Sequence, residues 1–309
     1  MLSRIAESMF WIGRYVERAE ATARILDVHY HLLVQGSVVD EAAACRAVLK
    51  VMGAGDAVTE HPSPTLVNEV LAYSHDHPSS VTAILFGARE NARGAREAVS
   101  SEIWETLNGT YHALPGRIAT ARSVGPNTFF RYVKERAAII AGLVDSTLVR
   151  DDGWRFYVLG RSIERVDMTA RLLIARTTTA EVPGGWVTTL LSCSAYEAYL
   201  RTYRRPVEAS VVVEFLLLDR LFPRSALFSL TEADIALAEL DRQQDRIGVE
   251  DEARRVIGRA AANLEFRRTD ELMADLPSHL GALQDAVART GSAVAARYFR
   301  RTTPVEWTA

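Results

Sequence analysis

Apolar positions along the chain recur at steps of three and four residues, the period of an amphipathic helix. The clearest seam lies near the start and lasts about 30 residues; its members are Ile5, Met9, Ile12, Val16, Ala19, Ala23, Leu26, Tyr30 and Leu33. A second seam consists of Leu159, Ile163, Val166, Ala170 and Leu173. Apolar–polar alternation, the pattern of strands, is scarce. We therefore expect an all-α protein with one long helix ending near Gly36 and another over about 152–175.

Prolines and glycines divide the rest of the chain into shorter predicted helices, and Pro115-Gly116 is taken as one of the breaks. The apolar run around Val212 is rich in valine but is interpreted as a buried helix. Between the two long helices we expect helices at about 40–52, 65–74, 79–108 and 126–148, and after them at about 186–203, 207–218, 225–246, 250–265 and 277–301.

An internal repeat is the most informative feature of the sequence. Residues 13–26 are GRYVERAEATARIL, and residues 160–173, which lie 147 positions later, are GRSIERVDMTARLL. Both copies fit the pattern GRxxERx[ED]xTAR, and each lies on one of the two long predicted helices. Repeats of this kind indicate stacked equivalent units. We expect one compact helical domain over 1–309, made of two pseudo-repeated halves at about 1–150 and 151–309.

Each copy of the repeat places a glycine in the middle of a helix, where it costs about 1 kcal/mol relative to alanine. Gly13 and Gly160 therefore indicate close approach by another backbone or by a ligand. At 100° per residue, Gly13, Glu17, Glu20 and Arg24 form a charged stripe beside the apolar seam.

Two interpretations of the charged repeat remain open. In the first, the charges form a structural network of ion pairs where the two long helices cross, because buried charges need partners. In the second, they form a site between the halves for an acidic or zwitterionic ligand. Arg24 and Arg171 would then hold a carboxylate or phosphate, and Glu17 and Glu164 would orient an amine or the arginines. The candidate residues are Arg14, Glu17, Arg18, Glu20, Arg24, Arg161, Glu164, Arg165, Asp167 and Arg171.

A second candidate site lies on the predicted helix 79–108. Arg89, Arg93, Arg96 and Ser100 step by four, three and four residues, so they share one face, which Trp104 and Asn108 extend. Such a stripe repels itself unless an anion or acidic partner lies against it. It is either a solvated face neutralised by neighbouring glutamates or a docking site. In the second half, Arg224 is expected to mirror this arginine stripe.

Composition narrows the function classes. The 36 basic and 39 acidic residues give a net charge of −3, which argues against a strongly basic nucleic-acid clamp. Lys50 and Lys134 are the two lysines, so arginine supplies nearly all the positive charge. No stretch of about 18 apolar residues predicts a membrane span, and the charged start of the chain does not resemble a signal peptide. Cys45 and Cys193 fit no disulfide framework, so a reducing cytoplasm is expected.

Motifs for nucleotide binding and for a serine nucleophile are absent from the sequence. His29 and His31 lie two residues apart on a helix and point in different directions, so they do not chelate one ion. No Glu-x-x-His pair indicates a di-iron bundle. We expect neither a metal nor a cofactor, and Cys45 and Cys193 are interpreted as core residues rather than nucleophiles.

The segment LSRIAESMFWIGRYVERAEATAR resembles the opening of the alpha-E domain family, bacterial helical proteins that carry a Glu-Arg motif. The motif corresponds here to Glu17-Arg18 and Glu164-Arg165. The stretches 88–108 and 222–225 also resemble the family, so the likeness covers nearly the whole chain. Genes of this family typically lie beside, or are fused to, a circularly permuted ATP-grasp protein. A transglutaminase-like protein is often encoded nearby.

This resemblance implies a role in the synthesis or modification of a peptide or amide, because ATP-grasp enzymes join carboxylates to amines or thiols. We expect an accessory subunit, without catalytic activity of its own, that binds the ligase, its peptide product or an acidic substrate. The alternative is a stand-alone enzyme or small-molecule binder with Glu17 or Glu164 as general base and Arg24 or Arg171 as anion holder. No nucleic-acid or membrane partner is expected.

Overall fold

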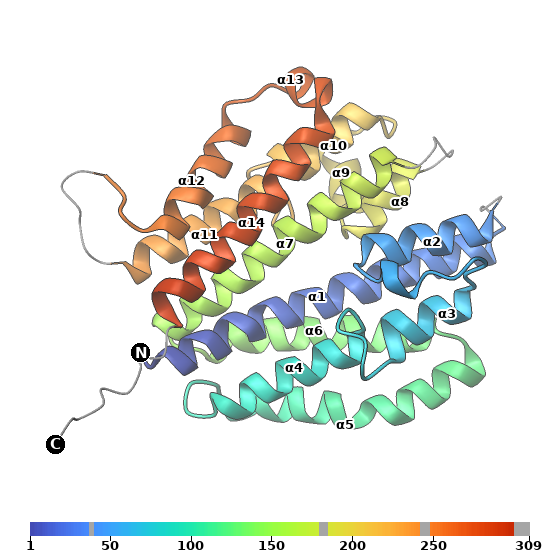
Figure 1. The fold of residues 1–309 in the computed structure, drawn as a ribbon, viewed down its shortest axis with the longest axis horizontal. Coiled ribbons are helices and arrows are strands. Elements are labelled where there is room, and N and C mark those ends of the chain that lie inside the picture. Colours follow the sequence, from blue (N-terminus) through green and yellow to red (C-terminus); the bar gives the residue numbers. More distant parts are fainter. Residues whose placement is uncertain (37–39, 179–184, 242–247, 300–309) are drawn as a thin grey trace.

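The computed structural model describes residues 1–36, 40–178, 185–241 and 248–299. Every regular element in these ranges is a helix, as the periodicity predicts. The two longest are α1 (Ser3–Val34) and α7 (Asp152–Thr178), which lie against each other through the middle of the molecule (Figure 1).

Three further helices complete the layer beneath α1 in Figure 1: α4 (Val81–Gly94), α5 (Ser101–Val124) and α6 (Asn127–Thr147). The contacts run from α1 to α4, α4 to α5, α5 to α6 and back to α1. The shorter elements between α1 and α4 are α2 (Glu41–Val51), η1 (Gly55–Ala57), α3 (Pro64–Asn68) and η2 (Glu69–Tyr73).

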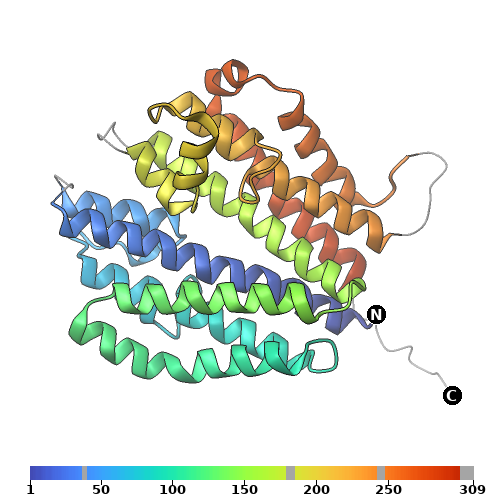
Figure 2. The same cartoon turned by 180° about the vertical axis from the view of Figure 1, so that it is seen from behind.

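The layer above α7 repeats this arrangement with α11 (Ala226–Leu240), α12 (Glu252–Glu265) and α14 (Leu276–Tyr298), and Figure 2 shows both layers from behind. Here α7 contacts α11, α11 contacts α12, α12 contacts α14, and α14 contacts α7. Each helix that carries a copy of the sequence repeat is thus the first member of the same closed circuit of four helices. The other elements are α8 (Gly185–Ser192), α9 (Tyr196–Tyr203), α10 (Ala209–Leu218) and α13 (Thr269–Ala274).

Apolar burial explains why α1 and α7 occupy the centre. Their seams are buried over most of their length; Met9, Ile12, Leu159 and Ile163 are examples. Contacts with neighbouring helices on several sides bury much of the surface of each helix. Such tertiary packing supplies most of the stability of helices in proteins. Both predicted seams are therefore confirmed as core.

A matching N-terminal cap begins the helix that follows each short-helix region. Ser80 accepts a hydrogen bond from the Ala83 amide at 3.0 Å and donates to the Ser74 carbonyl. Ser225 accepts from the Phe228 amide at 3.1 Å and donates to a carbonyl at the same spacing, six residues earlier. Both serines are buried, and each satisfies an otherwise unpaired helix amide.

Two predicted helices and one predicted break differ from the structure. The helix 79–108 is broken: α4 ends at Gly94, and Ser100 caps a new helix, α5. Pro115 is not a break but lies inside α5, on its exposed side. The helix 186–203 is two helices, α8 and α9, separated by a turn in which Ser194 has a φ of 54°.

The predicted helix 65–74 is α3 continued by the π-helical η2, and the remaining predicted helices are present with small shifts at their ends. The valine-rich segment is the buried helix α10, as predicted. α11 ends at Leu240, and residues 242–246 of its predicted range lie outside the described residues, as do residues 300–301 of the last predicted helix. No helix in the described ranges is both long enough and apolar enough to cross a membrane.

Candidate functional site

The two repeat glycines meet where α1 crosses α7. A Cβ atom on Gly13 would collide with the Tyr157 carbonyl oxygen and lie 3.0 Å from the Arg161 amide nitrogen. A Cβ on Gly160 would collide with the Phe10 carbonyl oxygen in the same way. Each glycine thus lets the other helix's main chain approach its own, which confirms the close approach that the sequence predicts and assigns it to backbone.

Glu164 of α7 is held by two arginines of α1. Its Oε2 accepts from Arg14 Nε at 2.7 Å, and its Oε1 accepts from Arg18 Nε at 2.5 Å. Arg18 also donates from Nη2 to Oε2 at 2.9 Å. The Glu164 side chain is completely buried, so these guanidinium groups replace the water that its charge would otherwise require.

Glu17 of α1 is held in turn by arginines from the second half of the chain. Arg165 of α7 approaches its Oε2 at 2.9 Å, and Arg224 donates to its Oε1 at 2.9 Å. The two Glu-Arg pairs of the repeat therefore exchange partners: Glu17 binds Arg165, and Glu164 binds Arg18.

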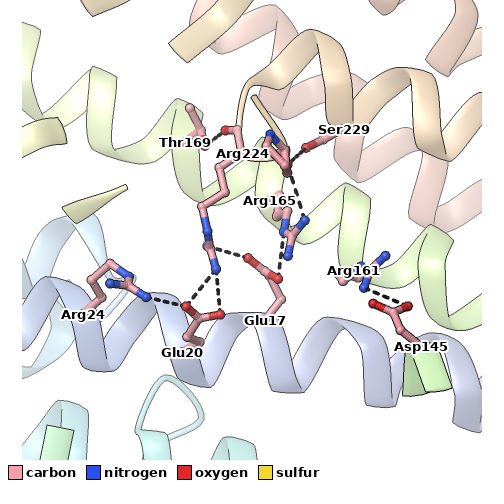
Figure 3. A network of polar contacts seen from close by, with 10 residues as sticks. Glu17, Glu20, Arg24, Asp145, Arg161, Arg165, Thr169, Arg224 and Ser229 are labelled. Carbon is pink, nitrogen blue, oxygen red and sulfur yellow. Dashed lines mark hydrogen bonds and ion pairs between the residues drawn. The ribbon is translucent and has the colours of Figure 1, made fainter. Parts of the chain in front are cut away.

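Arg224 extends the network along α1. It donates from Nη2 to both oxygens of Glu20, at 2.8 and 2.7 Å, and Glu20 also accepts from Arg24 at 2.5 Å (Figure 3). Figure 3 shows the Arg224 side chain passing from the start of α11 down to α1, between Glu17 and Glu20. Its main-chain carbonyl accepts from Thr169 of α7 at 3.3 Å, so this arginine contacts both long helices.

The turn before α11 positions Arg224. Asp219 accepts from the amides of Leu221 and Phe222 at 2.8 and 2.7 Å. The Phe222 ring stacks on Phe215, with the centroids 4.6 Å apart. With the Ser225 cap, these contacts fix the two ends of a short turn, and Arg224 projects from it.

The two copies of the repeat are not equivalent everywhere. Arg161, the counterpart of Arg14, does not pair with a glutamate of α1; its nearest acid is Asp145 of α6, 3.9 Å away. Asp167 and Arg171 match Glu20 and Arg24 as a pair within one helix, at 2.7 Å. Gln284 of α14 lies beside Asp167 at 3.5 Å, where Glu20 has Arg224.

Electrostatics keep the carboxylates charged. Burial disfavours the charged form of Glu164, but Arg18 and Arg14 outweigh it and hold the pKa of this carboxyl below its usual value. The same balance, with Arg224 and Arg24 as the cations, lowers the pKa of Glu20. Burial also disfavours the charged forms of Arg18 and Arg224. The pKa of Arg18 is nevertheless raised, mainly by Glu164, and the pKa of Arg224 is raised, mainly by Glu17.

This arrangement matches the structural interpretation of the repeat. A general base needs a carboxyl poised near neutral pH and within reach of a substrate proton. Glu164 has a lowered pKa, and Glu17 has guanidinium nitrogens on both oxygens. The ten candidate residues of the repeat together with Arg224, which we call the Glu-Arg network, comprise seven arginines and four acids. The Nε atoms of Arg24 and Arg161 are buried without a hydrogen-bond partner. Any further ligand bound by this network would therefore be an anion.

The second predicted site is assembled differently from the expectation. Arg89 reaches across from α4 to α5, where its Nε donates to Asn108 Oδ1 at 2.8 Å. Glu90 pairs with Arg89 and Arg93, each at 2.5 Å. Because the chain turns between Gly94 and Ser100, the predicted single stripe is wrong; two antiparallel helices bring its members together.

We call this surface the arginine–tryptophan patch and define it as Phe86, Arg89, Arg93, Arg96 and Trp104. Trp104 lies under two guanidinium groups, 5.1 Å from that of Arg96 and 5.8 Å from that of Arg89. Phe86 is exposed, as are the ends of Arg93 and Arg96. Ser100 does not belong to it, since its hydroxyl caps α5 by accepting from the Ile103 amide at 3.3 Å.

Arg224 does not mirror the arginine stripe, and that expectation is corrected. It belongs to the Glu-Arg network, far along the chain from the residues it binds. Sequence reasoning missed Asp145 and Gln284 entirely, because neither belongs to a repeat or motif. The signal for Arg224 was present in the helix stop and restart around Pro223 and Ser225.

His77 lies in a loop, and the two cysteines lie in the core. His77 Nδ1 accepts from the Ser79 amide at 3.2 Å, and no group of three potential metal ligands occurs among the described residues. Cys45 and Cys193 are both buried and free, as expected for core residues. Burial raises the pKa of the Cys193 thiol to about 12, which keeps it protonated and unreactive.

The chain is similar to uncharacterized proteins of Mycobacterium bovis and of two strains of Mycobacterium tuberculosis. Identity is 26% with the Mycobacterium bovis protein and 26% and 25% with the other two, over 263 residues in each case. Each match covers 77% of this chain but only 30% of the relative. No solved structure matches the chain.

A family model described as a predicted alpha-helical domain with a conserved ER motif matches residues 1–299. Glu17-Arg18 and Glu164-Arg165 lie in that range within the two copies of the repeat, and they exchange partners across the helix crossing. The chain belongs to the Alpha-E family.

Proposed function

We propose that this protein is an accessory subunit that works with a circularly permuted ATP-grasp amide or peptide ligase in peptide or amide biosynthesis. It would bind the ligase, its product or an acidic substrate rather than perform the ligation. The family's gene neighbourhood, given above as an implication of the resemblance, motivates the partner. The greater length of the mycobacterial relatives fits a unit that works beside other domains.

The observation that carries the non-catalytic role is the state of the motif's acids. The carboxylates of Glu17 and Glu164 are buried and bound by guanidinium groups from other helices. Freeing either one for proton transfer would leave buried arginines uncompensated, which is strongly unfavourable. The network therefore holds α1 against α7, and binding is left to other surfaces.

The arginine–tryptophan patch is the docking surface of this proposal. Arginine and aromatic side chains are enriched in protein interfaces and in their energetic hot spots. The exposed Phe86 lies against Tyr111, which the Arg89 guanidinium also contacts, and adds an apolar contact to the patch. A partner with an acidic and apolar face would fit this composition.

The test is co-expression with the neighbouring ATP-grasp protein, followed by affinity purification and determination of the mass by light scattering. A stoichiometric complex, lost in Arg93→Glu/Arg96→Glu, supports the proposal. Arg201→Glu is the matched control, because Arg201 is also exposed but lies on α9. No complex with the wild-type chain, together with unchanged turnover of the ligase in its presence, would refute it.

A second candidate function is a small-anion or amine site at the Glu-Arg network, acting in a stand-alone enzyme or binder. The excess of arginines and the unpaired Nε atom of Arg24 favour it. Calorimetric titration with inorganic phosphate and with a dicarboxylate tests this idea: binding that disappears in Arg24→Gln supports it, and no heat with either ligand refutes it.

The proposed location of the protein is the cytoplasm, because ATP is available there to the ligase partner and because the two free cysteines remain reduced there. The transglutaminase-like protein is proposed as a further partner, and no nucleic acid or membrane takes part. No cofactor is assigned.

A further inference from the structure

A groove of about 370 Å³ runs between α12 and α14, in the layer that lies on the far side of α7 from α5 (Figure 1). Its floor is apolar and includes Val256, Leu264 and Leu283, all of which belong to the core. Arg259, Arg267 and Arg289 form its rim and are exposed.

The groove has the length of a short helix. On α12 its lining extends from Val256 to Leu264, a rise of eight residue steps or about 12 Å. On α14 it extends from His279 to Arg289, a rise of ten residue steps or about 15 Å. Two to three turns of a partner helix fill this length, and its apolar stripe would lie on the floor.

The charges on the rim are unbalanced. Three arginines face one acid, Asp285, in a chain whose net charge is −3. Within the described part of the chain, Arg259 and Arg267 form no ion pair, and Arg289 has only Glu252, at 3.5 Å. Three cations around a concave apolar surface attract a complementary acidic group.

An exposed aromatic side chain lies at one end of the groove. Phe266, which precedes Arg267 directly, has 83% of its surface exposed, and Leu221 is 88% exposed. The ion pair between Arg220 and Glu265, at 2.9 Å, brings the segments of these two residues together. Large apolar side chains left in water beside a cationic groove are typical of an interaction surface.

We propose that the α12–α14 groove binds an acidic amphipathic helix of a partner protein, with the apolar face on the floor and carboxylates against Arg259 and Arg267. The apolar floor and its length favour a helix over a small anion, which would need only the arginines. This inference does not depend on the ATP-grasp proposal, because it uses a different surface in the other half of the chain.

The experiment measures fluorescence anisotropy of a labelled, hydrocarbon-stapled peptide of about three helical turns, with leucines on one face and glutamates on either side of them. The same peptide with glutamine at every glutamate is the control ligand. The protein variants are Arg259→Glu/Arg267→Glu, which reverses the rim charge, and Ala282→Trp, which fills the groove from an exposed lining position. Arg131→Glu is the control variant, because Arg131 is exposed on α6.

We expect saturable binding of the acidic peptide, weakened by about tenfold or more in both groove variants and unchanged in Arg131→Glu. The glutamine peptide should bind at least about tenfold more weakly than the acidic one. Absence of binding to the wild-type chain refutes the proposal, as does equal weakening by Arg131→Glu. Circular dichroism of each variant establishes that the fold is intact.

Discussion

Gly13 and Gly160 lie at the crossing of α1 and α7, and each occupies the place where a Cβ atom would collide with the other helix's main chain. The Glu-Arg pairs on either side of this contact then exchange partners across it. Close backbone approach and the ion pairs therefore belong to one arrangement. The glycines bring the helices near enough for short side-chain contacts between them.

The first prediction concerns these glycines. In Gly13→Ala the new methyl group meets the Tyr157 carbonyl oxygen, so the helices must separate. We expect a loss of about 2 kcal/mol in the free energy of unfolding, despite the better helix propensity of alanine. Urea denaturation measures it.

Gly142→Ala is the matched control. Gly142 is exposed in the middle of α6, and a Cβ there has no neighbour within 4 Å. Propensity alone should then raise stability by up to about 1 kcal/mol. Gains in both variants would contradict the close contact of α1 and α7.

The second prediction concerns Glu164. Glu164→Gln keeps the shape of the side chain but leaves Arg14 and Arg18 without their carboxylate. Because this removes one member of a buried ion-pair cluster, we expect a loss of about 3 kcal/mol. The control is Glu69→Gln, since Glu69 pairs with Arg122 on the surface and water already solvates both charges. Equal losses in the two variants would disagree with the buried role of Glu164.

The third prediction is the acid limb of the stability curve. The pKa of Glu164 is lower in the folded state than in the unfolded chain, so its contribution is complete above the ordinary carboxyl pKa. That contribution is lost as the pH falls through the lowered folded value. The free energy of unfolding, followed by urea titration below pH 5, should fall less steeply in Glu164→Gln than in the wild type. Parallel curves would contradict it.

The fourth prediction concerns His29, whose side chain is buried beside Cys45, with Nε2 3.8 Å from Sγ. Burial lowers its pKa from 6.5 to about 4. The unfolded chain therefore takes up a proton near pH 6.5 that the folded protein refuses until about pH 4. Stability should fall over this range as the pH falls, by about 3 kcal/mol in total.

The slope between pH 7 and pH 5 is the readout for His29. It should flatten in His29→Gln and persist in His112→Gln, because His112 is exposed on α5. A slope that survives in His29→Gln would place its origin elsewhere.

The fifth prediction is a coupling energy between Arg224 and Glu17. A double-mutant cycle with Arg224→Met and Glu17→Gln should give a coupling of about 1 kcal/mol or more, because both side chains are largely buried. The exposed pair Arg220 and Glu265 should couple by less than about 0.5 kcal/mol. Thermal or urea unfolding of the four variants in each cycle provides the numbers, and similar couplings would argue against the bridging role of Arg224.

The helices and the helix crossing could be predicted from sequence because their causes are local. Apolar seams recur at the helical period, and a glycine such as Gly13 inside a strong helix has few explanations. The break between α4 and α5 escaped prediction because the segment contains no proline and its residues Ala95 and Val99 are buried like those of a helix. Pro115 was predicted to be a helix break, but its exposed position lets α5 continue through it.

The composition of the Glu-Arg network could be predicted only in part. The ten candidate residues of the repeat lie around the crossing, but which arginine meets which glutamate depends on the relative placement of two helices. Arg224 is 207 residues from Glu17 along the chain, and its direction is set by a turn whose geometry comes from Asp219 and Phe222. No local pattern contains that information.

The exchanged pairs have a consequence for the internal symmetry of the chain. Each half carries a buried glutamate whose counter-charge lies on the other half, so a single half would be left with an uncompensated carboxylate. Two identical copies of one half, related by a twofold axis through the glycine contact, would satisfy both glutamates at once, as an isologous interface does. The protein thus has the internal construction of a homodimer joined into one polypeptide. Arg224 departs from this twofold arrangement, since the residue at the matching place before the first half's cap is Ser79.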